Sequence, residues 1–195
     1  MKPAIDRIRE FLGRHHRKEL NNPALKQAAV LILLFPKERS LHLLLTKRTD
    51  HVEHHKGQIS FPGGARDEQD ADLVATALRE TEEEIGLPPG AVQVLGMFDD
   101  FETPSGFAIT PVVGFVPSLP LLSPSLHEVA EIIEIPLTVF LEKKNERVVK
   151  MERQGRTHDV FYYNYSAHEV WGATAAMIRG FLLALGGDKS TENGY

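Results

Sequence analysis

Three glutamates are spaced so that their carboxylates share one face of a predicted helix. Glu80, Glu83 and Glu84 occupy positions i, i+3 and i+4, and side chains at these spacings are neighbours on an α-helix. Like charges so placed repel one another, so this arrangement does not serve helix stability. Mg²⁺ and Mn²⁺ prefer several oxygen ligands and retain bound water. The spacing therefore predicts a face that binds one of these cations.

The residues around the glutamates favour a metal site over an ordinary solvated helix face. A glycine-rich loop at residues 61–64 (Phe-Pro-Gly-Gly) precedes them, and glycine lets the backbone come close to a ligand. Arg79 lies one turn before Glu83 and is expected to hold that carboxylate in place. An isolated acidic run is usually solvated. A glycine loop, an acidic helix and a stop at Gly86 form a much rarer combination.

Hydrophobic patterning predicts the elements that position these residues. The acidic helix is expected over residues 71–85, with an apolar face formed by Val74, Leu78, Thr81 and Ile85, and Gly86 ends it at the C-cap. Trp171 is expected to anchor the last helix in the core. The other expected elements are helices 4–17, 137–141 and 171–185, strands 28–35, 40–46, 92–98, 107–115 and 131–135, a hairpin of strands 147–152 and 159–163, and a long polar loop over 48–70. Strands and helices mix without regular alternation, which predicts an α+β domain with a mixed sheet between helices.

The composition excludes several classes of protein. The chain of 195 residues has 42% hydrophobic and 25% charged residues, as ordinary globular domains do. It contains no cysteine, which excludes disulfide frameworks, thiolate zinc sites and cysteine nucleophiles. A net charge of −5 argues against nonspecific nucleic-acid binding. Because no secretory signal or long apolar run is found, we expect a cytoplasmic protein without a membrane partner.

From Arg79 to Leu87 the sequence resembles the signature of the Nudix hydrolases, G-x5-E-x7-R-E-U-x-E-E-x-G-U, in which U is a bulky aliphatic residue. Within this stretch only Thr81 departs from the pattern. Counting from Gly64, Asp70 takes the first Glu position, and eight residues instead of seven separate it from Arg79. The resemblance implies a Nudix-type α/β/α sandwich that contains the loop-helix motif of the family.

A narrower resemblance, to the coenzyme A diphosphatase branch of this family, extends over residues 28–185. It is carried by residues 44–48 and 57–64, and the longer loop before the Arg-Glu pair is usual in that branch. Further similar segments are 103–107, 110–114, 128–131 and 170–175. The branch has Ser and Arg where this chain has Thr49 and Glu53. The reversed charge at Glu53 bears on the choice of substrate and leaves metal-dependent hydrolysis untouched.

The resemblance implies hydrolysis of a nucleoside diphosphate linked to another group. For coenzyme A, the products are phosphopantetheine and adenosine 3′,5′-bisphosphate. Glu80 and Glu84 are implied as the principal ligands of Mg²⁺ or Mn²⁺, with Glu83 as a further ligand or a water-orienting carboxylate. The general base stays open between Glu83 and a distal carboxylate, Glu128 or Glu131.

Substrate-binding residues are expected in three groups. Cations neutralise the phosphates, glycines of the loop approach the substrate, and two residues border the nucleotide: Arg48, Lys56 and Arg66; Gly63 and Gly64; Ser105 and Phe107.

One alternative is a Nudix hydrolase of another derivative, such as ADP-ribose or NADH. A ligand-sensing module without turnover is disfavoured because all three glutamates are present. The expected organisation is an N-terminal helical segment (1–25), the Nudix domain (26–185) and a flexible tail (186–195). A monomer or homodimer acting on a small-molecule nucleotide substrate is expected.

Overall fold

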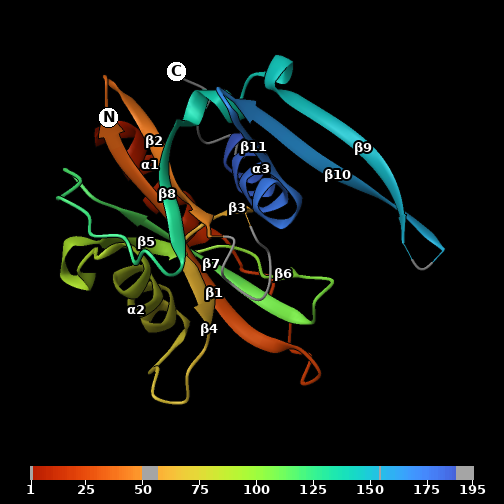
Figure 1. Ribbon diagram of the computed structural model, residues 1–195, viewed down its shortest axis with the longest axis horizontal. Coiled ribbons are helices and arrows are strands. Elements are labelled where there is room, and N and C mark those ends of the chain that lie inside the picture. The colour runs from red at the N-terminus through yellow and green to blue at the C-terminus, as the bar shows by residue number, and fades with distance from the viewer. Residues whose placement is uncertain (1, 50–56, 154, 188–195) are drawn as a thin grey trace.

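Strand β1 (Lys26–Lys37) forms the centre of a mixed sheet because its apolar run has to be covered on both faces. Residues 28–35 of this strand are all buried. The computed structural model describes residues 2–49, 57–153 and 155–187 (Figure 1). β1 pairs parallel with β7 (Phe107–Phe115) and antiparallel with β2 (Ser40–Arg48). The sheet order is β3 (Ile59–Ser60), β2, β1, β7, β5 (Gln93–Met97), with β4 (Gly63–Ala65) paired to β1, β6 (Phe101–Glu102) to β7 and β8 (Val129–Pro136) to β2.

Helices cover both faces of this sheet (Figure 1). Helix α2 (Leu73–Ile85) packs on the face to which Leu31 points. Helices α1 (Lys2–Arg14) and α3 (Gly172–Gly187) pack on the opposite face, with Ile32. Successive residues of a strand point to opposite faces, so the single run in β1 supplies both cores. The predicted α+β class and α/β/α sandwich are confirmed.

Helix α1 contributes to the main core. Ile5, Ile8, Phe11 and Leu12 are buried, as their helical spacing predicts. Leu12 lies against β5 at Gly96, where a β-carbon would come within 2.9 Å of the leucine Cβ. The helix is therefore packed on the same sheet that carries the acidic helix, and the boundary at residue 25 stays a prediction.

A second, smaller sheet joins β9 (Glu146–Arg153), β10 (Arg156–Tyr165) and β11 (His168–Trp171). The predicted hairpin is confirmed as β9 and β10, which extend away from the main sheet at the right of Figure 1. Short 3₁₀ turns η2 (Leu137–Phe140) and η3 (Lys143–Asn145) connect β8 to the hairpin, and η1 (Pro89–Ala91) precedes β5.

Several sequence-based predictions about the fold are wrong. The helix predicted over residues 4–17 starts at Lys2 and ends at Arg14. The segment predicted as a loop contains β3 and β4, which are too short to leave a hydrophobic pattern and which form because β2 and β1 offer free edges. Trp171 does not anchor α3 in the core; it is 40% exposed and stacks on Tyr162 with 5.9 Å between ring centroids. Val170 is buried, and neighbouring residues of a strand face opposite sides, which turns Trp171 outward.

The last helix of the chain continues further than expected, to Gly187. Residues 188–195, most of the predicted tail, lie outside the described residues. Among the residues that the structure describes, no helix is long and apolar enough to cross a membrane.

Candidate functional site

The acidic helix α2 has well-defined caps at both ends. At its N-terminus, the Asp72 carboxylate accepts a hydrogen bond of 2.8 Å from the backbone N–H of Ala75, a typical N-cap. At its C-terminus, Gly86 takes a φ of 70° and its N–H donates to the carbonyl of Glu82. This left-handed conformation favours glycine. The caps fix the helix register, and with it the positions of the carboxylates.

The predicted apolar face of α2 packs on the core, and one carboxylate of the helix is buried as well. Thr81 and Ile85 are buried as expected, whereas Val74 and Leu78 are only partly buried. Glu84 is 3% exposed, which apolar spacing does not predict. Burial of a carboxylate is costly unless a cation or hydrogen-bond donors compensate it. Glu84 therefore differs from the solvent-exposed glutamates of an ordinary acidic helix face, because it is buried.

The glycine loop makes room for one of the carboxylates. β4 pairs with β1 so that Gly64 lies opposite Ala29 and Gly63 opposite Val30. A β-carbon on Gly64 would lie 2.4 Å from Oε2 and 2.5 Å from Cδ of Glu80. A side chain at this position is therefore incompatible with the carboxylate where it stands. The predicted glycine loop and acidic helix thus meet directly.

Glu84 is paired with Arg48 at the end of β2. The distance from Arg48 Nη1 to Glu84 Oε1 is 3.6 Å, and the glutamate side chain is 4% exposed. Its second oxygen, Oε2, is buried and has no hydrogen-bond partner among the residues that the structure describes. Burial raises the pKa of Glu84 to about 8, with the Arg48 charge acting against this shift and Glu128 adding to it. The carboxylate therefore lacks full compensation by the protein.

Arg79 connects the remaining carboxylates into one network. Its guanidinium contacts Asp70 through Nε at 2.9 Å and through Nη2 at 3.0 Å. The same side chain reaches Glu80 at 2.9 Å and Glu83 at 3.0 Å. Asp70 is held further by the hydroxyl of Thr76 at 2.9 Å. The predicted contact between Arg79 and Glu83 is present, and Arg79 also restrains Glu80.

Asp70 also belongs to this site, although it is not among the residues that the sequence predicts for it. The signal for it was present, because Asp70 takes the first Glu position of the signature, but nothing in the pattern gave it a partner. Hydrogen bonds from Arg79 hold the pKa of Asp70 well below its usual range. The buried Asp70 carboxylate in turn raises the pKa of Arg79. Asp70 is thus the residue that fixes the arginine on which the glutamates depend.

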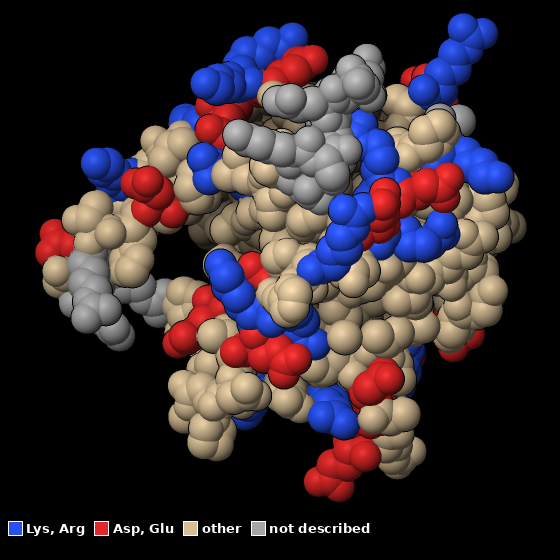
Figure 2. Space-filling view, turned by 180° about the vertical axis from the view of Figure 1, so that it is seen from behind, with Lys and Arg blue, Asp and Glu red and all other residues tan. Residues whose placement is uncertain are grey.

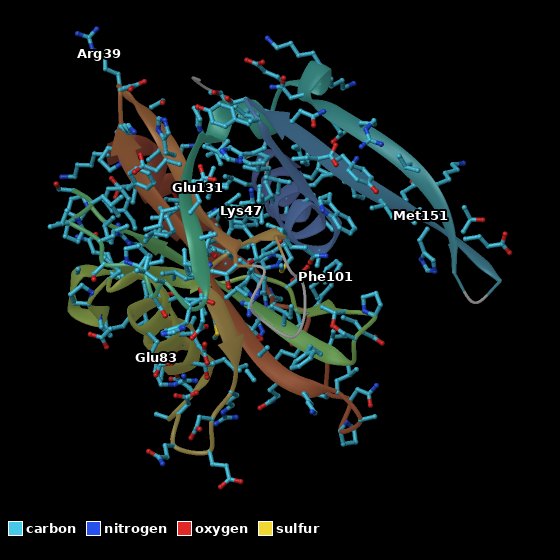
Figure 3. The ribbon with its side chains drawn as sticks, viewed as in Figure 1. Arg39, Lys47, Glu83, Phe101, Glu131 and Met151 are labelled. Carbon is cyan, nitrogen blue, oxygen red and sulfur yellow. The ribbon has the colours of Figure 1, made fainter. Side chains whose placement is uncertain are left out.

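The two distal carboxylates are placed differently. Burial raises the pKa of Glu80, and the charges of Glu83 and Glu128 raise it further. Glu128 is therefore electrostatically close to both Glu80 and Glu84. Glu131 instead contacts His168 at 3.3 Å. Figure 3 shows Glu131 on β8, well separated from Glu83 on α2.

The predicted substrate-binding residues lie around the start of β1. Arg66 donates to the side chain of Gln27 at 2.9 Å and to the carbonyl of Asp70 at 3.3 Å. Phe107 begins β7 next to the start of β1, and the Ser105 hydroxyl contacts that of Thr103 at 3.0 Å. Arg48, by contrast, stands beside Glu84. Lys56 and Glu53 lie outside the described residues.

Several charged side chains outside this site also form ion pairs. On the face shown in Figure 2, basic and acidic side chains are interspersed. Examples of such pairs in the chain are Arg17 with Asp100 at 3.2 Å and Lys37 with Glu134 at 2.6 Å. The acidic face of α2 differs because three glutamates there share two arginines.

The residues of this site fit a divalent cation in their chemistry. Within the described part of the chain, no three His, Asp or Glu side chains already gather as a metal-binding group; Arg48 and Arg79 contact the glutamates instead. The unpartnered Oε2 of Glu84 is nevertheless an oxygen ligand without a donor. Buried carboxylate oxygens are what Mg²⁺ or Mn²⁺ would neutralise. Glu80 and Glu84 are the side chains whose raised pKa values a cation would relieve.

Comparison with known proteins finds close relatives along most of the chain. The model of the NUDIX domain matches residues 25–131. A protein of Enterobacter sp. (strain 638) named Uncharacterized Nudix hydrolase NudL is 40% identical over 181 residues, which cover 91% of this chain and 94% of that protein. A protein of the same name from Escherichia coli O1:K1 / APEC is 40% identical over 182 residues, with the same coverage of both chains.

Solved structures share the fold at lower identity. The Nudix hydrolase RenU from M. smegmatis superposes with a TM-score of 0.50 and 24% identity over 58% of this chain and 71% of that one. A MutT/nudix family protein from Enterococcus faecalis has a TM-score of 0.52 and 16% identity over 95% of this chain and 74% of that one. These likenesses concern the fold alone.

Proposed function

The chain belongs to the Nudix family, and on this premise we propose that it hydrolyses the diphosphate bond of coenzyme A with the help of Mg²⁺ or Mn²⁺. The family hydrolyses nucleoside diphosphate derivatives, which gives the reaction class. Phosphopantetheine and adenosine 3′,5′-bisphosphate are the products for coenzyme A. The resemblance of residues 44–48 and 57–64 to the coenzyme A diphosphatase branch supports this substrate.

One observation carries the proposal: the glycine loop lies directly against the carboxylates of the acidic helix. Gly64 leaves no room for a β-carbon beside Glu80, and the buried Oε2 of Glu84 has no hydrogen-bond donor in the part of the chain that the structure describes. Arg48 and the backbone of Gly63 compensate Glu84 only in part, and an arrangement built only for stability would not bury such a carboxylate. A cation and a polyanionic substrate together explain both features.

Each residue of the site then has a chemical role. Glu80 and Glu84 would hold the cation, which supplies neutralisation of the diphosphate charge and a lower pKa for water. Arg79 keeps Glu80 and Glu83 in position through its contacts with both. Either Glu83 or Glu128 accepts the proton of the attacking water. Clustered carboxylates titrate together, so the base belongs to this group as a whole.

The remaining cations act on the substrate. Arg48 and Arg66 neutralise the phosphate oxygens, and the guanidinium group suits this task because it forms paired hydrogen bonds with phosphate. Ser105 and Phe107 border the nucleotide next to the start of β1. Glu131, which contacts His168, has no role in the chemistry proposed here.

A second substrate class is favoured by a specific feature of the sequence. Glu53 stands where the coenzyme A branch has Arg, and an acidic residue repels phosphate. ADP-ribose and NADH carry a diphosphate between adenosine and a second group that contains ribose, and both lack the 3′-phosphate of coenzyme A. They are therefore the alternative substrates of the same metal-dependent hydrolysis.

The proposal is tested by incubating the protein separately with coenzyme A, ADP-ribose and NADH in Mg²⁺ or Mn²⁺. Products are identified by liquid chromatography and mass spectrometry. The Glu84→Gln variant is the inactive control, and Glu82→Gln is the matched control, because Glu82 is an exposed glutamate of the same helix. Cleavage of coenzyme A that is lost only with Glu84→Gln supports the proposal. Cleavage of another substrate refutes coenzyme A, and ligand binding without cleavage refutes hydrolysis.

A further inference from the structure

Arg48 is turned toward the acidic helix by an irregularity in its strand. β2 and β8 pair in regular register up to Lys47 opposite Glu131, and the register then shifts so that Arg48 lies opposite Val129. Such bulges re-aim side chains and are common next to functional sites. The backbone N–H of Arg48 donates to the carbonyl of Gln58 at 3.0 Å. The strand end is therefore held in place while the side chain reaches α2.

The contact between Arg48 and Glu84 is a poor ion pair for such a buried place. The two side chains are 3.6 Å apart at Nη1 and Oε1, which is longer than a hydrogen bond. Arg48 Nε and Glu84 Oε2 are both buried, and neither has a hydrogen-bond partner within the described ranges 2–49, 57–153 and 155–187. A bidentate arginine–carboxylate pair would have satisfied both atoms. Each unsatisfied buried polar group costs free energy, so the pair leaves unmet hydrogen-bonding capacity on both sides.

Glu84 Oε2 and Arg48 Nε suit different ligands. A carboxylate oxygen without a donor suits a cation, and a guanidinium N–H without an acceptor suits an anion such as phosphate. A divalent cation on Glu84 would repel the Arg48 guanidinium at this distance. The Glu84 carboxylate would then face two positive charges, Arg48 at Oε1 and the cation at Oε2.

We propose that Arg48 is the counter-ion of Glu84 in the metal-free protein, and that a divalent cation displaces its guanidinium, which then binds a phosphate of the substrate. This inference deepens the proposed function, on which it rests, by making Arg48 the residue that couples metal binding to substrate binding. Arg48 competes with the metal when no substrate is present. With substrate bound, Arg48 instead contributes to holding it.

The proposal makes opposite predictions for metal and for substrate. In Arg48→Met, which keeps an apolar stem without the charge, the free protein should bind Mn²⁺ about tenfold more tightly, because a like charge near the cation has been removed. The same variant should bind substrate more weakly, with a raised KM. If Arg48 bound phosphate but were not the counter-ion of Glu84, the variant would have a raised KM and an unchanged affinity for Mn²⁺.

The experiment measures free Mn²⁺ by electron paramagnetic resonance in titrations of the full-length protein without substrate. Arg48→Gln is measured in parallel and carries the same expectation, so the test stands if the methionine variant does not fold. Arg48→Lys keeps the charge and should bind Mn²⁺ as the parent protein does. Lys47→Gln is the matched control, because it removes a positive charge from the neighbouring residue, which lies opposite Glu131.

Unchanged or weaker Mn²⁺ binding in both Arg48→Met and Arg48→Gln would overturn the inference. An equal gain in Lys47→Gln would overturn it as well, because the effect would then reflect net charge alone. The Mn²⁺ titration needs no turnover, so it tests the role of Arg48 even if coenzyme A is not hydrolysed. Conversely, hydrolysis of coenzyme A together with unchanged Mn²⁺ affinity would leave the proposed function standing without this role of Arg48.

Discussion

Replacing Gly64 with alanine tests directly whether the glycine loop exists to accommodate the Glu80 carboxylate. The new β-carbon would lie 2.4 Å from Glu80 Oε2, whereas ordinary contacts begin at 3.4 Å. The carboxylate therefore has to retreat by about 1 Å, and a displacement of this size in an active site costs roughly 100-fold in rate. The atoms that must move are the end of a flexible side chain, so the fold should tolerate the change.

Gly63→Ala is the comparison that separates chemistry from folding. At Gly63 the β-carbon would lie 2.3 Å from the backbone oxygen of Ala29 and 2.6 Å from Cα of Val30, and φ is 148°. Backbone atoms of a central strand cannot move away cheaply. We expect a loss of about 3 kcal/mol in the free energy of unfolding, which is roughly 10 °C in Tm for a domain of this size.

The assay combines thermal unfolding of both variants with turnover and Mn²⁺ titration. Gly64→Ala should keep a Tm within about 3 °C of the parent protein while losing activity and affinity for Mn²⁺. Gly63→Ala should instead show its main effect in the lower Tm. Parent-like activity in Gly64→Ala would refute the steric reasoning. So would a fall in its Tm as large as that of Gly63→Ala.

Three further predictions concern Asp70, Glu84 and Phe11. Asp70→Asn removes the carboxylate that holds Arg79 and should cost about 2 kcal/mol in urea unfolding at pH 7. The pKa of Asp70 is lower in the folded than in the unfolded protein. Its contribution to stability is therefore present above the unfolded pKa near ~4 and is lost as the pH falls toward the folded pKa. The free energy of unfolding of the variant should accordingly change less with pH in the acid range than that of the parent protein. Because burial raises the pKa of Glu84 and Mn²⁺ binds the ionised carboxylate, the affinity for Mn²⁺ should rise with pH as Glu84 loses its proton; electron paramagnetic resonance titrations at several pH values measure this rise, and Glu84→Gln should remove it. Phe11→Ala removes a buried ring that packs on Phe181 at 6.4 Å and should cost about 3–5 kcal/mol; a chemical denaturation curve like that of the parent would contradict the placement of α1 in the core.

Much of the fold follows from local patterning. The apolar run at residues 28–35 and the spacing of Ile5 and Phe11 predicted β1 and α1, because periodicity is a property of neighbouring residues. Gly86 predicted the end of α2 for the same reason. The pattern failed for Trp171, since a single aromatic residue beside a helix carries no information about which side of a short strand it will face. β3 and β4 escaped detection because their pairing partners, β2 and β1, supply the reason that they form.

The sequence alone determined that three carboxylates stand on one helical face and that a glycine loop precedes them, because the spacing of an α-helix is fixed by the backbone. Only the tertiary structure decided which carboxylate is buried and what each one contacts. Glu84 meets Arg48 through a bulge at the end of β2, and Gly64 meets Glu80 because β4 pairs with β1. Burial and ion pairing depend on segments that are distant in the sequence, so no local spacing specifies them.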